Sequence, residues 1–225
     1  MANSNRAGRP STNLLSPEII LGSAFLELEK SGLESLSMRR IAERLGVKAA
    51  SLYNHMHGKE EVLWKLADLI CSDISFPAAD KNWRDRLIEL LENYRNRLVS
   101  IKDGAKLLAQ TPPFGIHRIR LIEEFLQILR DSGLRKSLIV DTAFALNSYV
   151  LGFSMDENES RKQFEASNKA SDVDQFFSNL PPDEFPALRE FSEELALDSA
   201  DRRFHVGLDL ILEGVEKNAE QSKIS

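Results

Sequence analysis

Polar and cationic side chains are concentrated between Ser37 and Lys59, close enough together to bind one partner. Guanidinium, hydroxyl, amide and imidazole groups bond to phosphate oxygens and to base edges in duplex DNA. Arg39 could fork onto a guanine or onto two phosphates, and Asn54 could pair with an adenine. We therefore predict DNA contacts from Ser37, Arg39, Lys48, Ala49, Ala50, Ser51, Tyr53, Asn54, His55 and Lys59.

The apolar spacing in this stretch predicts two short helices joined by a turn. The first helix carries apolar residues at the i, i+3, i+4, i+7 positions of one face, namely Met38, Ile41, Ala42 and Leu45. Gly46 supplies the left-handed residue that ends this helix at low cost. The second helix, over residues 49–55, buries Leu52 and turns its polar side chains outward. The pattern predicts a helix-turn-helix whose second helix enters a DNA major groove.

The charge distribution is compatible with a DNA partner although the net charge is −6. Five cations stand against Glu43 alone between Ser37 and Lys59, and such a local cluster can hold phosphates on an acidic chain. Residues 1–15 carry Arg6 and Arg9 with no acid. We expect a disordered basic arm there, which either lies along a minor groove or is simply a loose terminus.

The rest of the sequence reads as all-α, with about ten helices and no strand alternation of useful length. We expect a three-helix DNA-binding bundle over 16–75 and a larger helical ligand-binding and dimerisation domain over 76–225. Helices over 137–157 and 201–217 are apolar most of the way round, which requires burial on more than one side. They predict a homodimer held by a four-helix bundle, with a purely intramolecular core as the alternative. Residues 158–183 are polar and are expected to form a loop.

No group of residues in the sequence suggests catalysis. His117 and His205 lack the neighbours of a metal or triad motif, and the carboxylates at 156, 157 and 159 are best interpreted as solvated charge. Cys71 is the only cysteine and is expected in the core. We find no signal peptide and no membrane span, so the expected location is cytoplasmic.

Two sets of residues carry a family resemblance. In the first part of the chain these are Gly32, Arg39, Ala42, Leu45, Gly46, Leu52, Tyr53, His55 and Lys59. They resemble the helix-turn-helix of the tetracycline-repressor (TetR) family. Trp83, Asp103-Gly-Ala-Lys106, Thr111 with Pro113, Leu151-Gly152, Pro181-Pro182 and Gly207-Leu208 are similar to its C-terminal domain. The resemblance implies a transcriptional repressor that binds a palindromic operator as a dimer and is released by a small molecule.

The resemblance also exposes departures. Ala49-Ala50 and Asn54 replace the Gln-Pro and Trp of tetracycline-sensing members, which implies a different operator. Leu108 stands where those members carry a magnesium-ligating histidine, and leucine cannot coordinate a metal. We therefore predict no metal, no cofactor and a fairly apolar effector. The predicted pocket residues are Leu90, Tyr94, Leu108, Thr111, Phe125, Phe144 and Asp156, with ordinary core packing as the alternative for each.

Two other functions stay open on the sequence. One is a constitutive DNA-binding regulator with a filled core and no effector. The other is a helical enzyme with a vestigial helix-turn-helix. No arrangement of catalytic residues in the sequence supports this second alternative.

Overall fold

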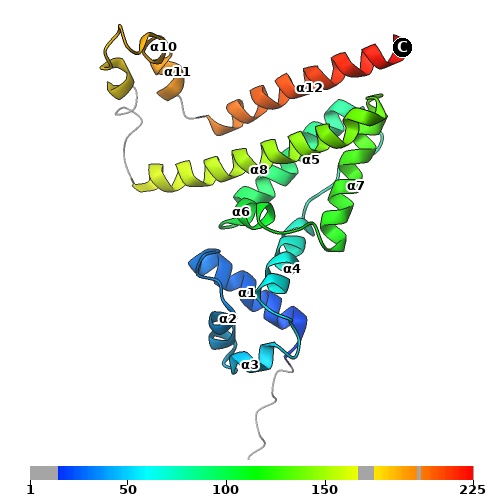
Figure 1. The fold of residues 1–225 in the computed structure, drawn as a ribbon, viewed down its shortest axis with the longest axis vertical. Coiled ribbons are helices and arrows are strands. Elements are labelled where there is room, and N and C mark those ends of the chain that lie inside the picture. Colours follow the sequence, from blue (N-terminus) through cyan, green and yellow to red (C-terminus); the bar gives the residue numbers. More distant parts are fainter. Residues whose placement is uncertain (1–14, 167–174, 197–198, 225) are drawn as a thin grey trace, which may run out of the picture. The chain divides into compact units, whose positions relative to one another are not determined.

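The computed structural model describes residues 15–166, 175–196 and 199–224, and every regular element in these ranges is an α-helix (Figure 1). The all-α prediction is confirmed. The chain divides into two compact units that meet between Leu66 and Ala67, inside helix α4 (Lys59–Cys71). The predicted domain boundary after residue 75 stays a prediction. The predicted arm lies, apart from residue 15, outside the described residues.

The first unit is built on three helices and the start of α4. These helices are α1 (Pro17–Ser31), α2 (Met38–Leu45) and α3 (Ala49–Leu52). The Ser16 and Ser37 side chains accept backbone N–H groups at the starts of α1 and α2. Gly46 ends α2 in the left-handed conformation, with φ of 67°. The core of the unit consists of fully buried side chains, namely Ile20, Ala24, Leu28, Leu36, Ile41, Leu52, Met56 and Val62.

The second helix of the helix-turn-helix is shorter than predicted. It ends at Leu52, and residues 53–55 form a turn. The Leu52 carbonyl accepts the N–H groups of both His55 and Met56, each at 2.9 Å. The bond from Met56 to Leu52 keeps the i→i−4 spacing of an α-helix through this turn, and the Met56 side chain is buried in the core of the unit.

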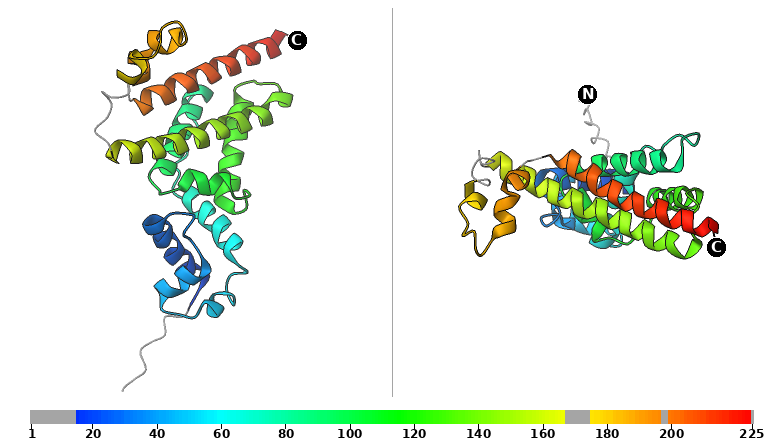
Figure 2. Two further views of the ribbon diagram at one scale, coloured as in Figure 1. Left: turned by 60° about the vertical axis from the view of Figure 1, so that its left-hand side comes forward. Right: turned by 90° about the horizontal axis from the view of Figure 1, so that it is seen from above.

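The second unit holds the remaining helices. They are α5 (Trp83–Val99), α6 (Gly104–Ala109), α7 (Ile116–Asp131), α8 (Lys136–Ala166), α10 (Pro186–Glu190), α11 (Ser192–Ala196) and α12 (Ala200–Ile224). Helices α5, α6 and α7 pack against α8, and α12 runs along α8 (Figures 1 and 2). Cys71 is buried as predicted, and burial raises the pKa of its thiol to about 12.

The loop prediction is wrong for residues 158–166, because α8 continues to Ala166. The interpretation of the carboxylates near its middle as solvated charge fails for Glu157. The buried Arg95 guanidinium of α5 donates to the Glu157 carboxylate at 2.8 Å. This ion pair anchors the helix where the sequence pattern indicates a polar end. The rest of the predicted loop includes residues 167–174, which lie outside the described residues.

Arg95 also joins α12 to α5. Its Nη1 atom lies 2.8 Å from Asp201, and its guanidinium lies over the rings of Phe204 and Phe153, 4.8 and 5.4 Å from the centroids. Further along α12, His205 bonds to Glu92 at 2.5 Å. The cations and acids of α5 thus fix α12 beside the core helices.

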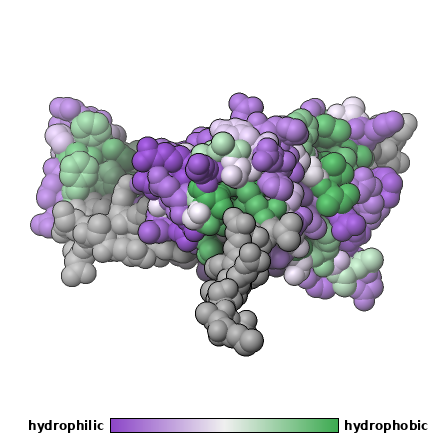
Figure 3. Space-filling view, turned by 90° about the horizontal axis from the view of Figure 1, so that it is seen from below, coloured by the Kyte–Doolittle hydropathy of each residue, from purple (hydrophilic) through white to green (hydrophobic). Residues whose placement is uncertain are grey.

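Apolar side chains stay uncovered on α8 and α12 in a single chain. Within the described ranges, the segment Lys136–Glu159 of α8 is the one helix long and apolar enough, by length and composition only, to cross a membrane. Only 17% of the apolar stretch within this segment is buried. Leu210 of α12 is 66% exposed. A second group of exposed apolar side chains lies in the segment that leads into and includes α10 and α11, and it includes Phe176, Phe185 and Phe191. Figure 3 shows a hydrophobic area, in green, at the left of the molecule.

Candidate DNA-binding surface and ligand cavity

The ten predicted DNA-contact residues all lie in the first unit, from the start of α2 to the start of α4. Most are exposed, namely Arg39, Lys48, Ala50, Tyr53, Asn54, His55 and Lys59, while Ser37, Ala49 and Ser51 are partly buried. The Tyr53 ring is 54% exposed, which leaves its hydroxyl accessible. The placement agrees with a groove-facing surface, and the individual contacts stay predictions.

The five cations of this stretch have different roles. Arg40 and Arg44 of α2 both bind the Glu27 carboxylate of α1, at 3.1 and 3.2 Å. Hydrogen bonds from Ser31 and from these two guanidinium groups lower the pKa of Glu27. Arg40 and Arg44 therefore hold α2 on α1. Arg39, Lys48 and Lys59 are the cations better placed to meet phosphates.

Arg39 is highly accessible to solvent. Its Nε atom lies 2.8 Å from Glu43 one turn further along α2, and its side chain is 84% exposed. A solvent-exposed pair of this kind is weak, so the guanidinium can exchange the carboxylate for DNA. Ser37 accepts the Arg40 N–H at 3.3 Å, and its own hydroxyl proton stays available to a phosphate.

The start of α4 is partly capped by the chain itself. The Glu61 carboxylate accepts the His57 N–H at 2.6 Å and pairs with Lys65 at 2.7 Å. An acid therefore occupies part of the N-terminus of α4, beside Lys59, which is one of the predicted DNA-contact residues. The Lys59 side chain itself is exposed.

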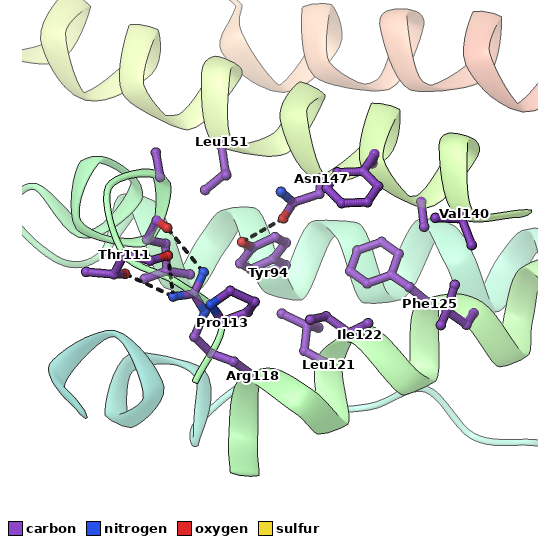
Figure 4. A pocket seen from close by; sticks show the side chains of 15 residues that line it. Tyr94, Thr111, Pro113, Arg118, Leu121, Ile122, Phe125, Val140, Asn147 and Leu151 are labelled. Carbon is purple, nitrogen blue, oxygen red and sulfur yellow. Dashed lines mark hydrogen bonds between the residues drawn. The ribbon is translucent and has the colours of Figure 1, made fainter. Parts of the chain in front are cut away.

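The second unit contains a cavity of about 320 Å³ between α5, α6, α7 and α8 (Figure 4). It is partly open to solvent, because Val140 and Phe144 in its wall are 52% and 69% exposed. Its apolar walls include Leu121, Ile122, Phe125, Val140, Phe144 and Leu151. Tyr94 projects from α5 at one end, with its ring edge-on to Phe125. The remaining lining residues are Leu108, Ala109, Thr111, Pro113, Arg118, Leu126, Ala143 and Asn147.

Five of the seven predicted pocket residues line this cavity, namely Tyr94, Leu108, Thr111, Phe125 and Phe144. The other two do not. Leu90 is fully buried in the core one turn before Tyr94, and Asp156 is exposed on α8 beyond the cavity. Arg118 and Asn147 also line the cavity and are not among the predicted pocket residues. Asn147 could have been found, because it continues the α8 stripe of Val140 and Phe144 at helical spacing.

Of the polar groups of the cavity, Thr111 and Arg118 lie beside α6, and Tyr94 and Asn147 lie between them and Phe125 (Figure 4). The Tyr94 hydroxyl donates to Asn147 Oδ1 at 3.2 Å, and burial raises the pKa of the tyrosine. The Arg118 guanidinium donates to the Leu108 and Pro112 carbonyls and to both oxygens of Thr111, at 2.9 to 3.1 Å. Arg118 therefore closes the carboxyl end of α6 while its side chain lines the cavity.

Comparison with known proteins covers both units. The sequence model of the bacterial regulatory proteins of the tetR family matches residues 20–64. The model described as the tetracyclin repressor-like C-terminal domain matches residues 76–219. The class A tetracycline repressor protein from transposon 1721 of Escherichia coli is 28% identical over 90% of this chain and 91% of its own length.

Two solved structures are similar over most of the chain. ActR of Streptomyces coelicolor in complex with actinorhodin is 27% identical, with a TM-score of 0.82, over 90% of this chain and 97% of that one. BioQ with its double-stranded DNA operator is 26% identical, with a TM-score of 0.64, over 88% and 95%. The matches span the helix-turn-helix and the cavity-bearing unit alike. This chain belongs to the TetR family of bacterial transcriptional regulators.

Proposed function

We propose that this regulator is a repressor that binds a palindromic operator as a homodimer, in the cytoplasm, and is released by a small, fairly apolar molecule. The observation that carries the proposal is the cavity in the unit that does not contain the helix-turn-helix. Its walls are mainly apolar, with a few convergent polar groups at one end, as ligand pockets usually are. ActR, a similar protein solved with actinorhodin, supports a small-molecule ligand for this regulator.

Operator binding rests on two copies of the helix-turn-helix. A symmetric dimer places two α3 helices in successive major grooves, roughly 34 Å apart. Arg39, Lys48 and Lys59 supply the phosphate charge, and Asn54 and His55 are exposed at the end of α3 to meet base edges. BioQ, solved with its DNA operator, supports this use of the fold.

The dimer would bury the apolar faces of α8 and α12. A helix that is long, apolar and mostly uncovered in one chain needs a second surface to pack on. A second copy provides that surface through two-fold symmetry, because each chain brings the same two helices. The exposed Leu210 and Val206 on α12 lie on such a surface.

Release requires that the ligand bind unequally to the DNA-competent and the released conformations. Arg118 offers the connection. Its side chain lines the cavity, and its backbone N–H is bonded at 2.9 Å to Asp68 on α4. Helix α4 starts at Lys59, among the DNA-facing residues. A ligand that moves Arg118 would therefore move α4.

The test uses purified protein and labelled duplexes from the region upstream of its own coding sequence. The expected result is salt-dependent binding to one palindrome, seen as fluorescence anisotropy, which a cavity ligand found by thermal shift then weakens. Binding that is equal on all duplexes would overturn the repressor assignment. Operator binding that no stabilising ligand weakens would leave the constitutive regulator as the better function.

A further inference from the structure

We infer that the cavity selects an amphipathic acid, a molecule with an aromatic or fused-ring body and one carboxylate that Arg118 and Asn147 bind. This inference deepens the proposed function and rests on it. It concerns the charge of the ligand, which neither the fold nor the apolar walls decide.

The lining of the cavity carries a positive charge. Arg118 is the only charged residue among the residues that line the cavity. Its guanidinium contacts four neutral oxygens, and within the described part of the chain no carboxylate lies within ion-pair distance of it. The nearby Asp68 carboxylate accepts the backbone N–H of Arg118 instead. The cavity therefore presents a positive charge that an anionic ligand can neutralise.

Arg118 and Asn147 keep hydrogen-bond donors that no described residue uses. Nη1 of Arg118 serves three acceptors and Nη2 serves one, which leaves Nε–H and one Nη2–H without an acceptor among the described residues. The Asn147 Oδ1 atom is taken by Tyr94, and the amide NH₂ has no acceptor in the same ranges. The vacant groups are donors, and an ionised carboxylate is acceptor-only.

The apolar walls and the volume of the cavity limit the shape of the rest of the ligand. Phe125 and Phe144 line the cavity together with branched aliphatic side chains, and these walls favour rings over a flexible polar chain (Figure 4). The volume of about 320 Å³ is near the lower end of the roughly 300 to 1,000 Å³ found for ligand pockets. An acid with two or three fused rings fits this space.

The experiment compares two probes of equal shape, 2-naphthoate and the neutral 2-naphthamide, by isothermal titration calorimetry at neutral pH. Charge-assisted hydrogen bonds predict about ten- to a hundred-fold tighter binding of the naphthoate. Arg118→Gln should reduce this preference to about equal binding. Arg120→Gln is the matched control, because Arg120 is exposed on the same helix and is not a lining residue.

A second variant keeps the test independent of the contacts that Arg118 makes to α6. Asn147→Asp preserves the acceptor for the Tyr94 hydroxyl and adds a negative charge. It should weaken 2-naphthoate at least tenfold and leave 2-naphthamide unchanged or tighter. Equal binding of both probes to the unmodified protein would overturn the inference, as would a naphthoate preference that survives both substitutions.

The two proposals fail differently. If both probes bind equally and either releases operator DNA, the ligand-responsive function stands and the acid preference is wrong. If naphthoate is preferred but never changes operator affinity, the acid site stands and the release mechanism is wrong. If neither probe binds at millimolar concentration, the ligand cavity itself is overturned.

Discussion

The Asp68 carboxylate accepts the backbone N–H of Arg118 at 2.9 Å, which ties α4 to the first turn of α7. A carboxylate at this position satisfies one of the free N–H groups at a helix N-terminus and opposes the helix dipole. The side chain of the same arginine lines the cavity. One residue therefore contacts both the ligand space and the helix that continues from the DNA-facing residues.

Gly115 makes this contact possible, so Gly115→Ala should break it. Its φ is 109°, and a Cβ atom there would overlap the carboxyl group of Asp68. We expect the free energy of unfolding to fall by about 1–3 kcal/mol or more, from backbone strain and the displaced carboxylate. Urea denaturation measures the change. The control is Gly22→Ala in α1, where the added methyl meets nothing within 4 Å and helix propensity should raise stability slightly. Equal effects of both substitutions would contradict the prediction.

Arg39→Ala and Tyr53→Ala should each weaken operator binding at least tenfold without unfolding the protein. Both side chains are exposed, so their loss removes DNA contacts and little packing. Arg39→Ala should also lower the steepness of the salt dependence if the guanidinium meets a phosphate. Anisotropy titrations at several salt concentrations measure both quantities.

Arg120→Ala, on α7 in the second unit, is the control for a lost positive charge. It should leave operator affinity within about twofold. If the Arg39 variant behaves like this control, the assignment of Arg39 to the DNA-binding surface is wrong.

Local patterns predicted most of the first unit. The left-handed Gly46 and the apolar spacing before it act within one or two turns, so the sequence displays them directly. The pattern extends the second helix to residue 55, whereas the regular helix ends at Leu52, because the turn that follows keeps the same i→i−4 bond and apolar spacing cannot separate the two.

Contacts over long sequence separations could not be predicted. In the sequence Glu157 resembles a solvated surface charge, because its partner Arg95 on α5 lies 62 residues away along the chain. Arg118 gives no sign in the sequence that it lines the cavity, since its position depends on how α6 ends against α7. Leu90 and Tyr94 lie one turn apart on α5, and only the packing decides which of the two reaches the cavity.

His205 should make the stability of α12 depend on pH. The hydrogen bond to Glu92, and then that to the Asp201 carbonyl, raise its pKa above the ordinary value. A pKa raised in the folded state means that the protonated form is stabilised by folding. The contribution is therefore complete below the unfolded pKa of about 6.5 and is lost as pH rises through the folded pKa.

His205→Gln tests this linkage. The variant should be less stable than the parent protein at pH 6, by less than about 1 kcal/mol because solvent screens the half-exposed pair, and equal to it at pH 9. Urea denaturation at the two pH values measures the difference. A gap that is the same at both would show that packing, and not the charge, holds His205.

Arg95→Met should be among the most destabilising single changes in the second unit. The side chain is buried between Glu157 and Asp201, and its removal takes away the 2.8 Å ion pair that the mostly buried Glu157 carboxylate makes with Arg95. Breaking a buried pair in this way costs about 3–5 kcal/mol. Arg84→Met is the control, because Arg84 also joins α5 to α12, but through Asp209 and Glu216, both far more exposed than Glu157. Its loss should cost about 1 kcal/mol or less. Thermal unfolding of both variants gives the comparison, and a smaller loss for the Arg95 variant would contradict the prediction.

Leu210→Asp should separate the proposed dimer while leaving each chain folded. Leu210 is 66% exposed on α12 in a single chain, so an aspartate there costs the isolated fold little. In a two-fold interface the same substitution buries two unpaired carboxylates, one from each copy, and opposes association. Light scattering after gel filtration should give the mass of one chain for the variant and of two for the parent protein. Leu26→Asp, equally apolar and 56% exposed but on α1, should stay dimeric. Because operator binding needs both helix-turn-helix elements at a fixed spacing, the Leu210 variant should also lose operator affinity, and a dimeric Leu210 variant would place the interface elsewhere.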